Sequence, residues 1–239
     1  MNYAFTNGKI LNGTKDMQIQ TGLCILVRDG KIYDIVKDTD DLDGYKIIDL
    51  QGHYILPGLI NMHVHLAGSG KPQKKQRDNE KLVNTIMGSA LTRAVAYNMV
   101  AGFAKDELLG GVTTIRTVGG LGDFDTRLRD EIEAGTKMGP RILAANQGIS
   151  VPGGHMAGSV AIAAANIDEA LAHLDKCEKE KVDIIKLMIT GGVLDAKKKG
   201  VPGELKMSPD MVRTVCDKAH ADGYMVSAHV ESPEGVRVA

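Results

Sequence analysis

The sequence predicts an α/β fold in which an incomplete TIM-type (β/α)8 barrel follows a small N-terminal β-unit. From residue 54 onward, short apolar runs alternate with helical segments, which is typical of a parallel sheet covered by helices. The glycine-rich phosphate fingerprint of a doubly wound sheet is missing after the first of these strands, and histidines stand at the strand ends instead. A (β/α)8 barrel carries its chemistry at such carboxyl ends.

The first 53 residues are predicted to form part of a small β-sandwich. Residues 22–28 (GLCILVR) are apolar and rich in β-formers, and residues 31–36 (KIYDIV) alternate between apolar and polar. The Asp-Gly pair at 29–30 favours a hairpin turn between them. Residues 46–50 are expected to add another short strand.

Residues 54–239 are predicted to form about five β/α units of the barrel. Strands are expected at 54–66, 112–117, 141–145, 182–189 and 225–228, and helices at 80–109, 125–134, 167–180 and 208–222. Ser208 and Pro209 are a capping residue and a first-turn proline, which favour a helix start. Ser232 and Pro233 repeat this signal near the end of the sequence.

Composition excludes several classes of protein. The 239 residues carry a formal net charge of −1, are 43% hydrophobic and contain no tryptophan, so a nucleic-acid or membrane partner is not expected. One local basic cluster is interrupted by polar residues and predicts a solvated loop; it comprises Lys71, Lys74, Lys75 and Arg77.

The location is expected to be cytoplasmic. The three cysteines are widely spaced, without a CxxC pair, and the sequence shows neither a signal peptide nor an apolar run long enough to span a membrane. A reducing compartment is therefore the natural expectation.

A His-x-His pair, His63 and His65, stands at the end of the first predicted barrel strand. Side chains two positions apart on a strand point to the same side, so both imidazoles can converge on one metal ion. Such a pair alone is also compatible with ordinary core or surface histidines.

Lys186 lies within an apolar run, Asp183 to Ile189, that is predicted to be a buried strand. Lysines are almost never fully buried without a partner. One interpretation is a side chain that extends from a strand end to solvent. The other is an amine whose pKa is lowered by burial and which takes up CO₂ to form a carbamate, an anionic ligand for metal.

The segment Leu56-Pro57-Gly58-Leu59-Ile60-Asn61-Met62-His63-Val64-His65, preceded by a strand and glycine at 47–52, resembles the opening motif of the amidohydrolase superfamily. The resemblance implies a hydrolase that uses one or two divalent ions, most often zinc, to activate water against an amide, lactam or ester. It implies that His63 and His65 bind one metal and that Lys186, on the fourth barrel strand, bridges two as a carbamate. It also implies that His229, after the fifth strand, binds the second.

Two further residues are candidates for contact with a small-molecule substrate. His155 lies in a glycine-rich loop, Gly153-Gly154-His155, that resembles the GGH loop of the Xaa-Pro dipeptidase-like and imidazolonepropionase-like branch. The alternative is that His155 is a structural residue of this loop. Arg116, at the end of the second strand, is a candidate carboxylate anchor or a member of a structural ion pair.

The remaining histidines have simpler predictions. His173 and His220 lie within predicted outer helices and are expected on the surface. His53 precedes the motif and is expected at the junction with the N-terminal sheet.

The bridging lysine favours a dipeptidase-like hydrolase of a dipeptide or N-acyl amino acid over a mononuclear, imidazolonepropionase-like cyclic-amide hydrolase. An ester hydrolase remains an alternative. The superfamily also supplies a sixth-strand histidine and an eighth-strand aspartate, the general acid/base, which are expected beyond residue 239. The 239 residues alone are therefore expected to be inactive. A non-catalytic fragment is the remaining alternative. The protein is expected to be a homo-oligomer.

Overall fold

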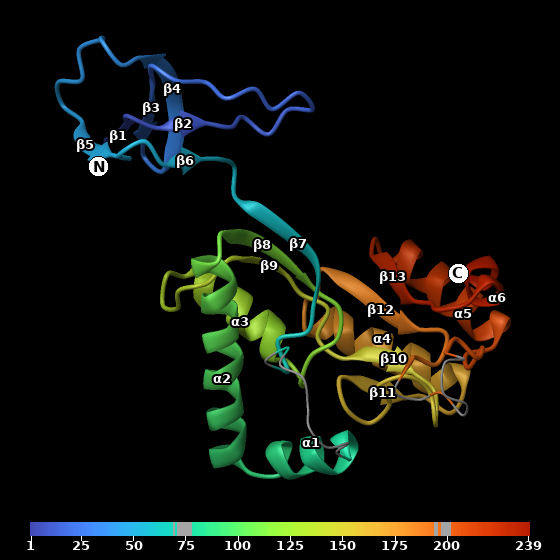
Figure 1. The fold of residues 1–239 in the computed structure, drawn as a ribbon. Helices are drawn as coiled ribbons and strands as arrows, with labels where there is room; N and C mark the ends of the chain where they lie inside the picture. The colour runs from blue at the N-terminus through green and yellow to red at the C-terminus, as the bar shows by residue number, and fades with distance from the viewer. Residues whose placement is uncertain (69, 71–77, 194–195, 197–201) are drawn as a thin grey trace. The chain divides into compact units, whose positions relative to one another are not determined.

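The computed structural model describes residues 1–68, 70, 78–193, 196 and 202–239. The chain divides into two compact units, Met1–Gly58 and Leu59–Ala239, each described by itself (Figure 1). The predicted basic loop at 71–77 lies outside the described residues.

The N-terminal unit consists of short strands. They are β1 (Tyr3–Thr6), β2 (Lys9–Ile10), β3 (Leu23–Arg28), β4 (Lys31–Lys37), β5 (Lys46–Asp49) and β6 (Tyr54–Ile55). Four form a sheet in the order β4-β3-β1-β5, and β2 pairs with β6. The predicted hairpin between β3 and β4 is present, because Asp29 and Gly30 both adopt the positive φ angles that its turn requires.

The larger unit alternates the predicted strands with helices, and two short strands at 148–150 and 161–163, which were not predicted, follow the third predicted strand without a helix between them. The strands are β7 (Leu59–Val64), β8 (Val112–Thr117), β9 (Arg141–Leu143), β10 (Gly148–Ser150), β11 (Ala161–Ala163), β12 (Ile184–Met188) and β13 (Met225–His229). The helices are α1 (Asn79–Met87), α2 (Ala90–Leu109), α3 (Phe124–Glu133), α4 (Ile167–Lys179), α5 (Pro209–Ala221) and α6 (Pro233–Val238).

All strand pairs of the larger unit are parallel. Their orders are β7-β8-β9 and β11-β10-β12-β13. Ala144, just after β9, connects the two groups, because its carbonyl accepts a hydrogen bond from the Asp183 amide at 2.7 Å. The five predicted strands therefore lie in chain order, and their carboxyl ends share one edge of the unit.

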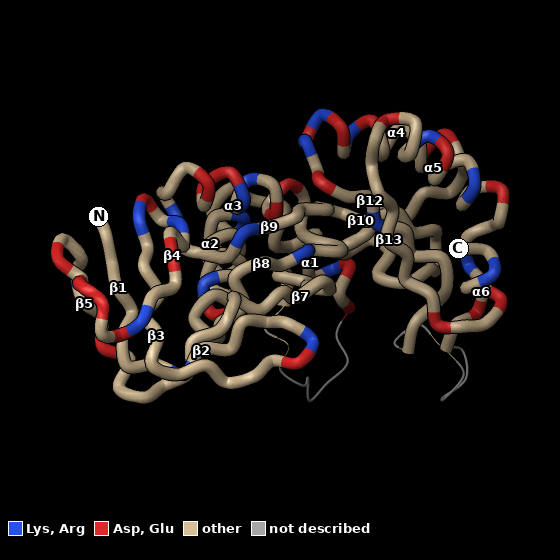
Figure 2. Tube along the Cα trace, turned by 90° about the horizontal axis from the view of Figure 1, so that it is seen from above, with Lys and Arg blue, Asp and Glu red and all other residues tan. Residues whose placement is uncertain are grey.

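Two apolar clusters hold the helices against these strands. Leu66, Ile115 and Leu128 belong to the cluster between β7–β9 and α2–α3. Ile185 and Val215 belong to the cluster between β10–β12 and α4–α5. Charged residues of both signs alternate along the outer helices instead of gathering in one patch (Figure 2).

The helix predicted over 80–109 is two helices. It breaks at Gly88 and Ser89, where the Ser89 hydroxyl accepts a hydrogen bond from the Thr92 amide at 3.2 Å and caps α2. The prediction treated this cap as helix interior. The Ser208 cap of α5 and the Ser232 cap of α6 are present as predicted.

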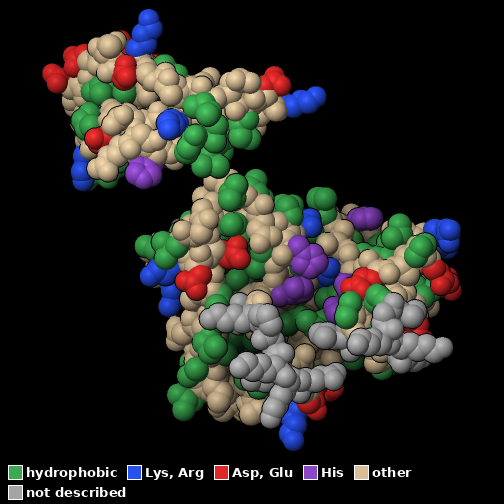
Figure 3. All heavy atoms as spheres, viewed as in Figure 1, with side chains coloured by type: hydrophobic (Ala, Val, Ile, Leu, Met, Phe, Trp, Pro, Cys, Tyr) green, Lys and Arg blue, Asp and Glu red, His purple; other side chains and the backbone are tan. Residues whose placement is uncertain are grey.

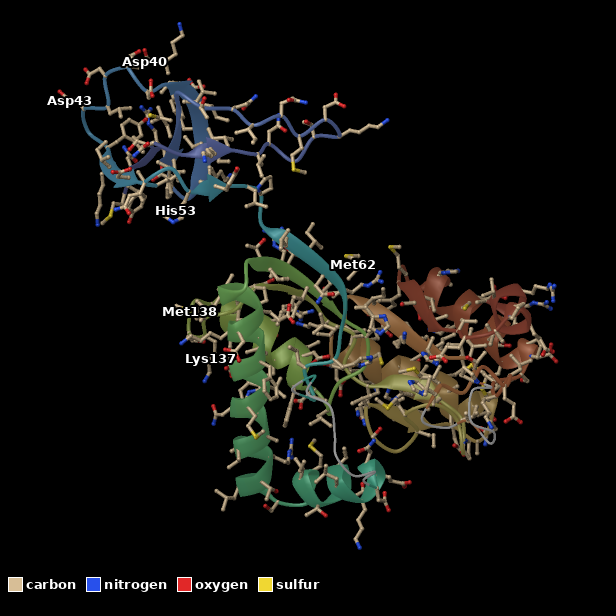
Figure 4. The ribbon with its side chains drawn as sticks, viewed as in Figure 1. Asp40, Asp43, His53, Met62, Lys137 and Met138 are labelled. Carbon is tan, nitrogen blue, oxygen red and sulfur yellow. The ribbon has the colours of Figure 1, made fainter. Side chains whose placement is uncertain are left out.

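The outermost strands leave apolar side chains exposed. Leu59 and Ile60 on β7 are 52% and 64% exposed, and Met225 on β13 is 72% exposed. Met62 also lies on β7 and is 46% exposed (Figure 4). No helix in the described part of the chain combines the length and apolarity of a membrane span.

Candidate metal centre

The His63–His65 pair is formed by the carboxyl end of β7. The two Nε2 atoms are 3.3 Å apart and the ring centroids 5.2 Å apart. Two nitrogens that bind one tetrahedral ion at ~2.0–2.1 Å would be about 3.3–3.4 Å from each other. The pair therefore has the spacing that a shared metal ion requires.

A backbone carbonyl orients His65. Its Nδ1 lies 3.0 Å from the oxygen of Gly119, and a carbonyl oxygen can only accept, so Nδ1 carries the proton and Nε2 keeps its lone pair. Gly119 has a φ of +135°, and a Cβ at this position would lie 3.2 Å from Cε1 of His65. Only glycine suits both the backbone angle and this close approach.

Burial favours the neutral form of both rings. Burial lowers the pKa of His63 and of His65, and the positive charge of Lys186 lowers both further. A neutral imidazole is the form that binds a metal ion. The shifts also show that Lys186 acts on the same site as the two histidines.

Lys186 is buried, with 2% of its surface exposed, in the middle of β12. Burial, and then the charge of Arg116, lower its pKa to about 8. Its stem passes Gly148 on the neighbouring strand, where a Cβ would lie 3.1 Å from Cγ of Lys186. The interpretation of Lys186 as a solvent-directed side chain is wrong, because the structure buries it.

His155 and His229 form a second pair at the same edge. Their rings stack with centroids 3.9 Å apart and planes inclined by 11°. Nε2 of His229 also lies 3.6 Å from Oε1 of Glu231. Gly192 makes room for the stack, since a Cβ there would meet Nδ1 of His155 at 2.5 Å.

Arg116 is half-buried near the carboxyl end of β8. Its Nε donates to the carbonyl of Met62 at 2.8 Å, and its charge lowers the pKa of both Lys186 and His63. The guanidinium is therefore held at the site by backbone and keeps its other N–H groups for further contacts.

The sequence-predicted residues come together at one face. Histidine side chains gather at the centre of the larger unit as seen in Figure 3. Among the described residues, no three His, Cys, Asp or Glu side chains are grouped closely enough to hold a metal ion.

The other histidines lie apart from this group. His173 is 6% exposed, so the prediction of a surface residue is wrong. Its Nε2 donates to the Gln147 carbonyl at 3.0 Å, which turns the ring inward. His220 is exposed on α5, as predicted. His53 is exposed on the N-terminal unit (Figure 4).

Sequence reasoning missed the residues that shape the site without carrying a reactive group. Gly119 and Gly148 each leave space that one of the candidate side chains fills. The glycine pair at 119–120, directly after an apolar strand, was the available signal for a turn at the site.

Solved structures support this architecture. A candidate prolidase from Bifidobacterium longum is 33% identical with a TM-score of 0.75, over 99% of this chain and 51% of its own. A Xaa-Pro dipeptidase with bound methionine in its active site is 28% identical with a TM-score of 0.78, over 100% of this chain and 59% of its own.

A curated relative matches a shorter stretch. A dihydroorotase from Bacillus cytotoxicus is 41% identical over 75 residues, which is 31% of this chain and 17% of the dihydroorotase. The chain thus spans a small part of this relative and between half and 60% of the solved structures.

The match that decides the family covers most of the chain. Residues 54–238 match the family described as the Amidohydrolase family. This stretch includes both histidine pairs, Lys186 and Arg116. The chain belongs to the Amidohydrolase family.

Proposed function

We propose that the protein is a metal-dependent amidohydrolase that directs activated water onto an amide bond of a dipeptide or N-acyl amino acid, as a prolidase does. The observation that carries the proposal is a pair of imidazole nitrogens 3.3 Å apart, whose pKa values are lowered by burial and by the charge of the buried Lys186. A structural role alone does not explain three potentially cationic groups placed together in a partly buried site.

The donor set fits one or two zinc ions. His63 and His65 would hold one ion through Nε2, and His229 the second, with Lys186 between them. A bound divalent ion supplies Lewis-acid chemistry, lowering the pKa of water and polarising a carbonyl. The neutral, oriented form of His65 supports this assignment.

Lys186 is suited to become the bridging anion. With a pKa of about 8, roughly a tenth of the amine is unprotonated at pH 7, against well under 0.1% for an ordinary lysine. The free amine attacks the carbon of CO₂, a C–N bond forms and one proton leaves, which gives a carbamate with two anionic oxygens. This modification would turn a cation that repels metals into a ligand.

The remaining candidates suit the substrate. A dipeptide has a carboxylate, which Arg116 can bind through the N–H groups that do not contact Met62. His155, stacked on His229, would contact the scissile carbonyl. The similarity to the candidate prolidase and the Xaa-Pro dipeptidase supports a substrate of this class.

We also propose that β7 to β13 are part of a closed (β/α)8 barrel. The strands are parallel, and β7, β8, β9, β12 and β13 lie in chain order. Exposed apolar residues lie on β7 and β13, where further strands would pack. A cytoplasmic homo-oligomer is the proposed setting; three free cysteines in the described residues support a reducing compartment.

A cyclic amide is the second candidate substrate, because the dihydroorotase resembles this chain at 41% identity over its matched stretch. The complete natural protein, assayed with Xaa-Pro dipeptides, N-acyl amino acids and dihydroorotate, separates the two. We expect chelator-sensitive release of free amino acid from a dipeptide or N-acyl amino acid. Turnover of dihydroorotate alone would favour the cyclic-amide alternative, and metal-loaded protein that hydrolyses none of them would contradict the proposal.

A further inference from the structure

A buried polar network lies directly behind the turn that orients His65. Its central member is Asp125 in the first turn of α3, which is 1% exposed. Burial raises the pKa of this carboxyl, and hydrogen bonding with the Thr117 hydroxyl and the backbone amide of Asn146 lowers it. In the described part of the chain its second oxygen, Oδ2, has no hydrogen-bond partner. Keeping a carboxylate in such a place costs stability, so an apolar residue would serve the fold better.

The Asp125 carboxylate packs against the turn itself. A Cβ at Gly120 would lie 2.5 Å from Oδ2 and 2.8 Å from Cγ of Asp125. The Gly120 amide donates to the carbonyl of Asn146 at 2.8 Å. Gly120 is therefore held from two sides, and the preceding residue, Gly119, carries the carbonyl that accepts from His65.

Asn146 connects the same turn to the helices. Its φ is +53°, and its side-chain Oδ1 accepts from the Thr126 amide at 3.1 Å. Its Nδ2 donates to the Thr126 hydroxyl at 3.0 Å and to Oε2 of Glu180 at 2.9 Å. Because these groups are buried and paired, the position of the turn is fixed by α3 and the end of α4.

We infer that Asp125 is a positioning residue for His65: together with Asn146 it fixes the Gly119–Gly120 turn, and through the Gly119 carbonyl it selects the Nδ1–H form of His65 whose Nε2 faces the metal site. The inference rests on the proposed metal centre. It assigns to Asp125 no contact with metal or substrate.

The test compares Asp125→Ala with Asp125→Asn. Alanine removes the acceptor of two hydrogen bonds, whereas asparagine keeps one oxygen of the same shape for both. Zn²⁺ affinity is measured by competition with a chromophoric chelator, and the tautomer of His65 by long-range ¹H–¹⁵N NMR of the metal-free protein. We expect Asp125→Ala to weaken Zn²⁺ binding by about 10–100-fold and to populate the Nε2–H form. Asp125→Asn should stay close to the wild type in both measurements.

Val215→Ala, in the core between α5 and β12, serves as the control for general destabilisation. It should lower the midpoint of urea unfolding and leave the Zn²⁺ affinity and the tautomer unchanged. If Asp125→Ala does not fold, Thr117→Val removes one of the two donors, together with the acceptor of the Ala145 amide, with little change of shape. It should shift the same two readouts in the same direction.

Wild-type protein that binds no Zn²⁺ would refute the proposed metal centre, while the tautomer measurement would still report on the network. Wild-type protein that binds Zn²⁺, together with a foldable Asp125→Ala or Thr117→Val variant that keeps both affinity and tautomer, would overturn the inference alone. If Val215→Ala weakened Zn²⁺ binding and shifted the His65 tautomer as much as Asp125→Ala does, the inference would also be overturned.

Discussion

At the scale of single residues, the site depends on how burial changes the charge of nitrogen groups. Burial lowers the pKa values of Lys186, His63 and His65. Each of these nitrogens therefore loses its proton more readily than in water, and each becomes available to bind an electrophile. Burial of the Lys186 amine costs desolvation free energy and leaves a nitrogen that can react with CO₂.

Lys186→Ala should remove most activity of the complete natural protein, and a short carboxylic acid such as acetate or propionate should restore part of it. The reason is that a small carboxylate can enter the vacated space and present two anionic oxygens, as the carbamate would. The measurement is kcat/KM against carboxylic acid concentration.

Lys186→Arg is the matched control, because arginine remains charged and cannot form a carbamate. Added carboxylic acid should not rescue it. Full activity and full metal content in Lys186→Ala would show that the lysine only packs against β10, and a mononuclear site would then be the better account.

At the scale of elements, the loops after the strands place the reactive groups. The loop after β12 brings Gly192 against His155, and the loop after β10 brings His155 onto His229. β12, which precedes the first of these loops, was predictable from its apolar sequence, whereas the three-residue β10 was not. The stack was not, because loop conformation depends on contacts between segments distant in the sequence.

Gly192→Ala should displace His155 from His229. A methyl group at this position would lie 2.5 Å from Nδ1 of His155, so the ring must move. We expect kcat/KM for the dipeptide substrate to fall at least tenfold, on the order of the effect of misplacing a substrate-positioning group, while α-helical circular dichroism stays unchanged.

Gly102→Ala in α2 is the control for this substitution, since no atom lies within 4 Å of a Cβ there. It should leave kcat/KM unchanged and stabilise the protein slightly, because alanine favours helix over glycine. Wild-type activity of Gly192→Ala would argue against a role for the His155–His229 stack.

The predicted helices and strands differ from the structure where two signals in the sequence compete. Gly88 and Ser89 end one helix and cap the next, whereas apolar periodicity continues across them. His173 lies in a helix as predicted, but the partner that draws its ring inward, the Gln147 carbonyl, is 26 positions earlier in the chain. The three-residue strands β10 and β11 are too short for a periodic signal.

At the scale of the whole molecule, the sequence predicts the alternation of strands and helices and the edge at which the histidines meet. Both follow from hydrophobic patterning and the parallel topology. The buried network of Asp125, Asn146 and Thr117 was not predicted, because nothing in the sequence distinguishes these polar residues from exposed ones. The edge at which the histidines meet therefore follows from the sequence pattern, whereas the buried network beside it depends on packing.

The stability of the protein should depend on the protonation of Asp125. Burial raises the pKa of this carboxyl to about 6 from an ordinary value of 3.8. The unfolded chain releases the proton near pH 4 and the folded chain only near pH 6, so this group lowers the free energy of unfolding as pH rises through that window. The loss is on the order of 3 kcal/mol and is complete above pH 6.

Asp125→Asn removes this titration. Urea unfolding from pH 4 to pH 8 should show the variant gaining stability over the wild type between pH 4 and pH 6, with a constant difference at higher pH. The pKa of His173 is lowered by burial, so this group acts in the opposite direction, and it is common to both proteins and cancels in the difference. A difference that does not change with pH would contradict the assignment.

The proposed metal centre requires His63, His65 and Lys186 to hold metal together. X-ray diffraction from crystals of the complete natural protein grown with zinc and bicarbonate, recorded on both sides of the zinc absorption edge, tests it most directly. We predict an anomalous peak bonded to Nε2 of His63 and of His65, with continuous density for a carboxylated Lys186 beside it. Zinc absent from this position, with Lys186 present as an unmodified amine, would contradict the account.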